Sequence, residues 1–181
     1  MRVVFPRVLR ILVVGAFCVG GVFASQEEEV FLAPDRFVQN AFAGEGEPES
    51  KRLWLTAKLK PAIRKILGHD YAALRLRYWQ QGSRTAWILE EIGKVKPITT
   101  GFVVDEGKIS QVQVLVYRES HGWEVKHPFF TDQFIGAELK KNLKMDRRID
   151  SIAGATLSVN ALRKLGQLAL YLDGQVQDSA G

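Results

Sequence analysis

The stretch ITTGFVVDEGKISQVQVLVY, residues 98–117, decides the fold that this sequence predicts. Residues 98–104 and 109–117 are rich in β-branched side chains, and in the second run valines alternate with glutamines, as is typical of strands. Between them, Asp105 to Lys108 includes a glycine and forms a turn signal. The stretch therefore predicts two antiparallel strands joined by a tight turn.

Two further strands are predicted on the N-terminal side of this hairpin. Residues 74–79 alternate leucine with arginine, and residues 85–91 form another apolar run after a turn signal at 81–83. Consecutive strands joined by short turns favour an antiparallel sheet of about four strands in meander order.

Helices are predicted before and after these strands. Residues 25–70 form an N-terminal helical segment, with one helix over 34–43 and a second that begins at Ser50 and restarts at Pro61, giving a kinked helical hairpin. Residues 158–172 carry apolar side chains at helical spacing and are followed by Asp173-Gly174 as a stop signal. We therefore expect an α+β domain over residues 71–173 in which the C-terminal helix packs on the sheet, followed by a flexible tail over 174–181.

The first 24 residues have the three-part pattern of a secretory signal peptide. Arginines come first, then an apolar run from Ile11 to Phe23, and then Ala24. The run is shorter than the about 20 apolar residues that a membrane span needs, although an uncleaved N-terminal anchor is the alternative. The sequence predicts a periplasmic or exported protein, with membrane association as the alternative.

Composition and charge argue against several classes of function. The chain has 181 residues and is 46% hydrophobic, as is typical of a globular domain. Removal of residues 1–24 takes away three arginines and lowers the formal net charge from +5 to +2, so we do not predict binding to nucleic acid. The one cysteine, Cys18, leaves with that leader, which excludes disulfide-stapled folds and cysteine-ligated clusters in the exported chain. His121 and His127 are six residues apart, with Gly122 between them, so no helical face brings them together. No cysteine or closely spaced His-x-Glu pair accompanies the three histidines, so no metal site is predicted.

The segment DSIAGATLS, residues 150–158, carries the most specific chemical signal. Three small residues, 153–155, let the backbone approach a bulky group closely. The hydroxyl of Thr156 follows at the start of the predicted helix, whose free N–H groups favour a phosphate at or near this residue. The alternative is that Thr156 or Ser158 is only an N-cap and that the small residues serve close packing.

The pattern Asp-x-x-Ala-Gly-Ala-Thr from Asp150 to Thr156 resembles the recognition motif of the FMN-binding domain family. That family occurs in subunits of ion-translocating oxidoreductases and in small exported flavoproteins. The hairpin and the segment 130–136 are also similar to the family, so the resemblance covers about residues 98–172. The sequence departs from the family at Ala153, where serine or threonine is usual. The resemblance implies that a flavin transferase attaches FMN covalently to Thr156 through a phosphoester bond.

The resemblance also implies which residues surround the cofactor. In the motif that begins at Asp150, close approach would come from Gly154 and Ala155, and the phosphate would be flanked by the backbone N–H groups of Leu157 and Ser158. The segment RESHGWE, residues 118–124, falls where the family has a glycine-containing loop. Its candidates for contact with the isoalloxazine ring are Glu119, Ser120, Gly122 and Trp123. Packing in the core or at its rim explains the tryptophan equally well.

These features predict an exported electron carrier that needs no catalytic side chain of its own, because the flavin supplies the redox chemistry. Its expected partners are the flavin transferase and a membrane-bound or periplasmic redox protein. Two alternatives stay open: a flavin-dependent reductase that acts directly on a small acceptor, and a flavin-free periplasmic binding or adaptor module.

Overall fold

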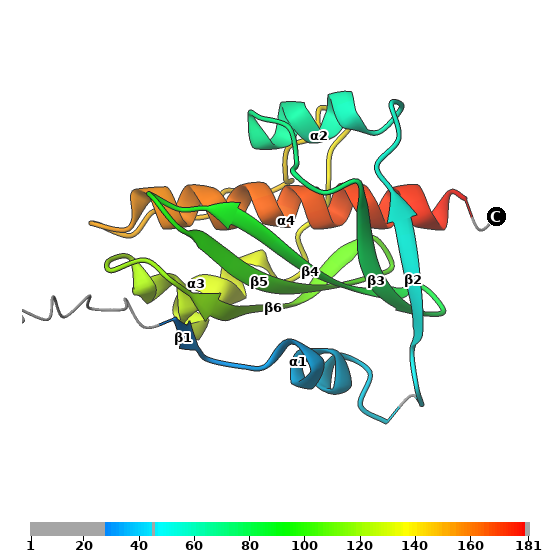
Figure 1. The fold of residues 1–181 in the computed structure, drawn as a ribbon, viewed down its shortest axis with the longest axis horizontal. Helices are drawn as coiled ribbons and strands as arrows, with labels where there is room; N and C mark the ends of the chain where they lie inside the picture. The colour runs from blue at the N-terminus through cyan, green and yellow to red at the C-terminus, as the bar shows by residue number, and fades with distance from the viewer. Residues whose placement is uncertain (1–27, 45, 180–181) are drawn as a thin grey trace, which may run out of the picture.

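The computed structural model describes residues 28–44 and 46–179. Its centre is a six-stranded antiparallel sheet in the order β1-β6-β5-β4-β3-β2 (Figure 1). The strands are β1 (Glu29–Val30), β2 (Glu49–Trp54), β3 (Arg75–Gln81), β4 (Arg84–Ile92), β5 (Pro97–Asp105) and β6 (Lys108–Tyr117). The helices are α1 (Pro34–Ala41), α2 (Lys60–Leu67), α3 (Pro128–Thr131) and α4 (Thr156–Gln177), with short 3₁₀ helices η1 (Trp123–Lys126) and η2 (Asp132–Phe134) on either side of α3.

The hairpin predicted over residues 98–117 is confirmed as β5 and β6. The two strands pair from Thr99 opposite Val116 to Asp105 opposite Lys108. At the turn, Glu106 and Gly107 both have positive φ angles, 50° and 75°, which is the backbone that a tight two-residue hairpin turn needs. The meander from β3 to β6 is likewise confirmed.

The sheet has six strands, not four, because the segment before the meander adds both edge strands. A helix from Ser50 was predicted there and is wrong: the segment is β2, which pairs along its length with β3, from Glu49 opposite Gln80 to Trp54 opposite Arg75. The six residues are too few to show a helical period, and a ladder of backbone bonds decides their conformation. At its end the Arg75 guanidinium lies 5.5 Å from the centre of the Trp54 ring, a cross-strand contact that supports the pairing.

Among the described residues of the N-terminal segment, helical structure is confined to two short helices. The helix predicted from Pro34 corresponds to α1, and α2 ends at Gly68, which has a φ of 85° and caps it in the left-handed conformation. Strands β1 and β2 occupy part of the same segment. The predicted kinked helical hairpin is therefore wrong.

The two faces of the sheet carry separate cores. Figure 1 shows α4 lying along one face and α1 on the other. Trp87 and Phe102 are fully buried on the α4 side, and Phe37 of α1 is fully buried on the opposite side. A Cβ on Gly101 of β5 would come within 2.6 Å of the Phe37 ring, so this strand position needs glycine. The predicted α+β class, with a C-terminal helix on an antiparallel sheet, is confirmed.

Helix α4 runs antiparallel to β4, which decides where its first turn lies. Lys164 of α4 reaches Glu91 near the end of β4, and Asp173 accepts a hydrogen bond of 2.7 Å from Thr85 near its start. The first turn of α4 therefore lies beyond the end of β4. The predicted stop at Asp173-Gly174 is wrong, because the buried Asp173 carboxylate also accepts a bond from Gln177 and the helix continues to that residue.

The predicted signal peptide, residues 1–24, and the last two residues of the predicted tail lie outside the described residues. Within the part of the chain that the structure describes, no helix combines the length and apolar character needed to cross a bilayer.

Candidate functional site

The first turn of α4 begins without a capping side chain. Its N-cap is Ala155, and the first intrahelical bond runs from the Val159 N–H to the Ala155 carbonyl at 2.9 Å. Thr156 is the first helical residue and its side chain is exposed. The alternative that Thr156 or Ser158 serves as the N-cap is therefore wrong. The N–H groups of residues 156–158 have no partner within the helix and carry its positive dipole end.

The residues just before the helix leave space beside Thr156. Gly154 has a φ of 82°, and a Cβ built on it would meet no other atom within 4 Å. Ala155 is buried, and its N–H donates to the carbonyl of Ile152 at 3.0 Å. The chain thus turns tightly into α4 while its outer side stays open.

The loop that carries the motif, residues 150–155, is held in place by hydrogen bonds at its start. The N–H of Asp150 donates to the side-chain oxygen of Gln133 at 2.7 Å, while the Asp150 side chain is exposed. Arg163, further along α4, donates to the carbonyl of Ile149 and to the hydroxyl of Ser151. These contacts hold the approach to Thr156 in one place.

The structure brings the 118–124 loop against this helix start. A Cβ on Gly122 would lie 2.6 Å from the hydroxyl oxygen of Ser158, in the first turn of α4. The Tyr117 hydroxyl donates to the carbonyl of His121 at 2.6 Å, so the bond of 2.8 Å between Tyr117 and Ser158 has the serine as donor. Burial raises the pKa of Tyr117, which keeps this phenol protonated. The buried hydroxyl of Ser158 therefore joins the 118–124 loop to the first turn of α4 and is not free to contact a group at the helix start.

Glu119 and Ser120 have other partners. One carboxylate oxygen of Glu119 accepts hydrogen bonds from the N–H groups of Lys94, Val95 and Lys96, at 2.5, 2.6 and 2.8 Å. Burial acts to raise the pKa of Glu119, but these three bonds outweigh it and hold the pKa below its usual range. The exposed Ser120 hydroxyl lies 2.9 Å from the His121 ring. Glu119 thus shapes the turn between β4 and β5 beside the site.

Trp123 stands at the surface of this loop. Its side chain is 45% exposed, which rules out a core position. The ring meets His127 edge-on at 5.5 Å between ring centres, and the Lys126 ammonium lies 5.1 Å from its centre. Leu157, beside Thr156, is 49% exposed. Trp123 of the loop and Leu157 of α4 are therefore both exposed to solvent, on the two segments that meet at Gly122 and Ser158.

Two features of the site become complete only in the structure. One side-chain oxygen of Glu124, next to Trp123, is buried and has no hydrogen-bond partner among the described residues. A second feature is a hollow of about 520 Å³ behind the motif loop, whose lining includes Lys144, Arg147, Arg148 and Arg163. Lys144, Arg147 and Arg148 precede the motif closely in the sequence, whereas Arg163 joins them only through folding.

The three histidines do not form a metal centre in the structure. His69 lies before β3, and the other two lie in the loop after β6. Across the described ranges, 28–44 and 46–179, no group of three histidine, cysteine or acidic side chains could hold a metal ion.

Comparison with known proteins adds one finding. Residues 93–171 match the model of the FMN-binding domain family. A search of curated proteins and a search of solved structures each gave no match. The matched segment begins at the turn held by Glu119, and it contains the 118–124 loop, the motif and most of α4. The resemblance read from the sequence is therefore confirmed at the level of an FMN-binding domain.

Proposed function

We propose that this protein is an exported flavoprotein that carries FMN covalently on Thr156, through a phosphoester bond, and serves as an electron carrier. The match of residues 93–171 supports FMN as the cofactor. The observation that carries the covalent proposal is the start of α4: an exposed threonine hydroxyl lies on the first turn of a 22-residue helix that no side chain caps.

The donors at this helix start fit a phosphate group. Unpaired N–H groups and the positive dipole end favour an anion at this point. The open space at Gly154 leaves room for it, since a Cβ there would meet nothing within 4 Å. The cations around the hollow behind the loop, among them Arg148 and Arg163, add positive potential. Leu157 and Ser158 would contribute through their backbone N–H groups.

The neighbouring loop offers surfaces for the flavin ring. Trp123 and Leu157 are half-exposed and flank the helix start, and aromatic rings favour stacked or edge contacts with one another. The unpartnered oxygen of Glu124 would be satisfied by a hydrogen-bond donor on a bound group. When bound, FMN supplies the electron transfer, while the chain anchors the group, orients it and leaves part of it accessible.

Export and partners follow from the sequence rather than from the fold. The leader over residues 1–24 directs the chain out of the cytoplasm in this proposal. A covalent bond then prevents loss of a cofactor that diffusion would carry away. A flavin transferase would form the bond between the Thr156 hydroxyl oxygen and the flavin phosphate, and a membrane-bound or periplasmic redox protein would exchange electrons with it.

Intact-mass measurement tests the covalent proposal. Full-length protein is produced in a host with an active flavin transferase, together with Thr156→Val and, as a matched control, Thr56→Val at an exposed threonine outside the site. We expect a yellow product with one FMN adduct for the unchanged chain and for Thr56→Val, and none for Thr156→Val. An adduct that survives Thr156→Val refutes the assignment. Colourless, unmodified protein in every case favours the flavin-free binding module.

One observation favours a flavin-dependent reductase as the second candidate. A hollow of about 600 Å³ lies between β3 and β4, and this volume is within the range of small-molecule sites. Steady-state turnover with soluble acceptors separates the two functions. In this assay a carrier gives electron exchange that ends when its reduced flavin has been oxidised, whereas a reductase gives turnover that saturates as the acceptor concentration rises.

A further inference from the structure

Strands β3 and β4 separate at one end of the sheet. They pair only from Tyr78 opposite Trp87 to Gln81 opposite Arg84, although β4 continues to Ile92. The hollow of about 600 Å³ lies in this opening, which we call the β3–β4 slot. Its lining combines apolar side chains with a few polar groups: His69, Asp70, Tyr71, Ala72, Ala73, Leu76, Ile88, Glu90, Glu91, Ile92 and Pro97.

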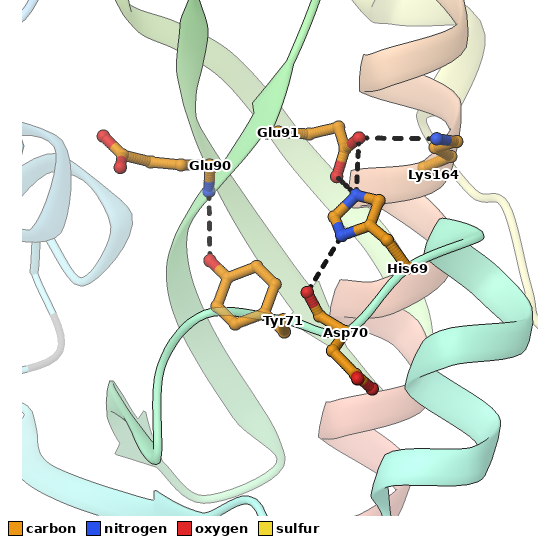
Figure 2. Close-up of polar contacts among 6 residues, drawn as sticks. All are labelled: His69, Asp70, Tyr71, Glu90, Glu91 and Lys164. Carbon is orange, nitrogen blue, oxygen red and sulfur yellow. Dashed lines mark hydrogen bonds and ion pairs between the residues drawn. The ribbon is translucent and has the colours of Figure 1, made fainter.

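An ion cluster around one buried carboxylate lies at one end of the slot. The Glu91 side chain is only 4% exposed, and its oxygens lie 3.0 Å from the His69 ring nitrogen Nε2 and 3.3 Å from the Lys164 ammonium. The other ring nitrogen of His69 lies 2.9 Å from the Asp70 carbonyl. Because a carboxylate and a carbonyl only accept hydrogen bonds, His69 makes both bonds at once only when both ring nitrogens carry hydrogen, which is the imidazolium form. Figure 2 shows the three side chains converging from β4, α4 and the segment before β3.

Tyr71 supplies an unpaired donor in the same slot. Its hydroxyl oxygen accepts the Glu90 N–H of β4 at 3.3 Å, where β3 no longer pairs with that strand (Figure 2). Among the described residues, the phenol hydrogen has no acceptor. Burial raises the pKa of Tyr71, so the hydroxyl keeps this hydrogen at neutral pH.

Charges in the lining disfavour an anionic ligand. The only cationic side chain in the lining, His69, is bound to Glu91. The carboxylate of Asp70 is held by Arg64 at 2.6 Å, and Glu90 points to the side of β4 opposite Glu91 (Figure 2). Glu90 lies 3.7 Å from the Arg118 guanidinium, and Glu91 contacts Lys164 as well as His69, so each of the three carboxylates in the lining already has a cation as partner. A charged ligand would therefore compete with ion pairs that are already formed, whereas a neutral acceptor oxygen would find the Tyr71 hydroxyl.

We propose that the β3–β4 slot binds a neutral, flat ring compound with carbonyl oxygens, the chemistry of a quinone. The ring lies against Leu76, Ile88 and Ile92, and one carbonyl accepts a hydrogen bond from Tyr71. Lys164 lies eight residues after Thr156 on α4, about 12 Å along the helix axis, so the slot is near the start of α4. The proposal concerns binding and does not depend on flavin attachment.

Calorimetric titration with duroquinone tests the proposal on the purified full chain. Duroquinone is fully methylated, so it cannot add to the Cys18 thiol. Two ligands serve as controls for chemistry: durene, which is the same ring without oxygens, and tetramethylbenzoate, which carries a negative charge. We expect duroquinone to bind more tightly than either control, and tyrosine side-chain NMR signals to shift at Tyr71.

Variants locate the binding. Tyr71→Phe removes one hydrogen bond and weakens duroquinone binding by about fivefold to tenfold. Ile92→Glu places a charge on a side chain that is 57% exposed at the slot, and abolishes binding. Ile135→Glu makes the same change at a 40% exposed isoleucine elsewhere and leaves binding unchanged. Circular dichroism establishes that each variant is folded.

The outcomes are distinct. Binding that persists in Ile92→Glu, or that is equally tight for durene or tetramethylbenzoate, overturns the proposal. Thr156→Val, which cannot carry the flavin, is expected to bind duroquinone as the unchanged protein does. If duroquinone binds Thr156→Val but not the unchanged protein, the flavin itself occupies the slot, and this also overturns the proposal. If the unchanged chain carries no FMN adduct but binds duroquinone as expected, the proposed function is refuted and the slot assignment stands.

Discussion

Gly122 lies against Ser158 so closely that a Cβ on the glycine would come within 2.6 Å of the serine hydroxyl oxygen. The serine cannot move away freely, because its hydroxyl is bonded to Tyr117, which is bonded in turn to His121. This contact joins the loop after β6 to the first turn of α4. The geometry of the proposed flavin site therefore depends on a position without a side chain.

Gly122→Ala should disturb both stability and flavin attachment. The added methyl group clashes with Ser158, and the φ of 86° strains any residue with a side chain. We expect the free energy of unfolding to fall by about 1–3 kcal/mol, and the yield of FMN adduct to fall with it. Urea unfolding and intact mass measure the two effects.

Gly82→Ala is the matched control, because Gly82 has a φ of 56° and open space around it. It carries backbone strain without the clash, so it is expected to cost about 1 kcal/mol and to leave the adduct yield unchanged. Equal adduct yields for the two variants would show that the loop contact does not matter for the site.

Ala153→Ser adds a hydroxyl at the position where the FMN-binding domain family, which this sequence resembles, usually has serine or threonine. Ala153 is exposed, so the serine adds no buried polar group, and stability should change by no more than about 0.5 kcal/mol. The hydroxyl adds a donor to the loop that precedes Thr156, and we expect faster attachment of FMN. A time course of adduct mass with purified transferase measures this rate. Slower attachment than in the unchanged chain would contradict the prediction.

The sequence was most informative where a local pattern is decided by local forces. The β5–β6 hairpin could be predicted because alternation and a glycine turn specify it within 20 residues. The motif also marked the start of α4, because small residues and a hydroxyl precede a long apolar stripe. Strand β2 could not be predicted, since its conformation depends on pairing with β3, and no feature of Glu49–Trp54 itself favours a strand strongly.

Contacts between distant segments limited the prediction of the site. Glu119 was expected at the flavin ring, yet its carboxylate is taken by the N–H groups of the turn at 94–96. The β3–β4 slot could not be foreseen, because it exists only where two strands stop pairing. Residue type indicates which side chains can do chemistry, while folding decides which partners they meet.

Glu119→Ala should loosen the turn between β4 and β5. It removes a carboxylate that accepts three backbone hydrogen bonds, so we expect a loss of about 1–3 kcal/mol. Faster amide exchange at residues 94–96 would identify the turn as the place affected. Exchange that is unchanged there would contradict the structural role.

The same contact has a predictable pH dependence. The pKa of Glu119 is lower in the folded than in the unfolded state, so its contribution is present above the unfolded pKa and is lost as pH falls through the folded pKa. The difference in stability between the unchanged chain and Glu119→Ala should therefore shrink below about pH 4. Urea unfolding at a series of acidic pH values measures it.

The contact between His69 and Glu91 should make stability depend on pH in the opposite direction. The bond to the Asp70 carbonyl and the bond to Glu91 raise the pKa of His69 above its ordinary value. A raised histidine pKa adds stability below the unfolded pKa, which is about 6.5, and this stability is lost as pH rises through the folded pKa.

His69→Gln cannot titrate, so its stability should vary less than that of the unchanged chain as pH rises from about 6 to about 8. His121→Gln changes an exposed histidine in another loop and is expected to keep the full pH dependence. The midpoint of urea unfolding, measured across this pH range, tests the prediction. If the midpoint changes with pH by the same amount in His69→Gln and in the unchanged chain, the cluster at the β3–β4 slot does not hold a protonated imidazole.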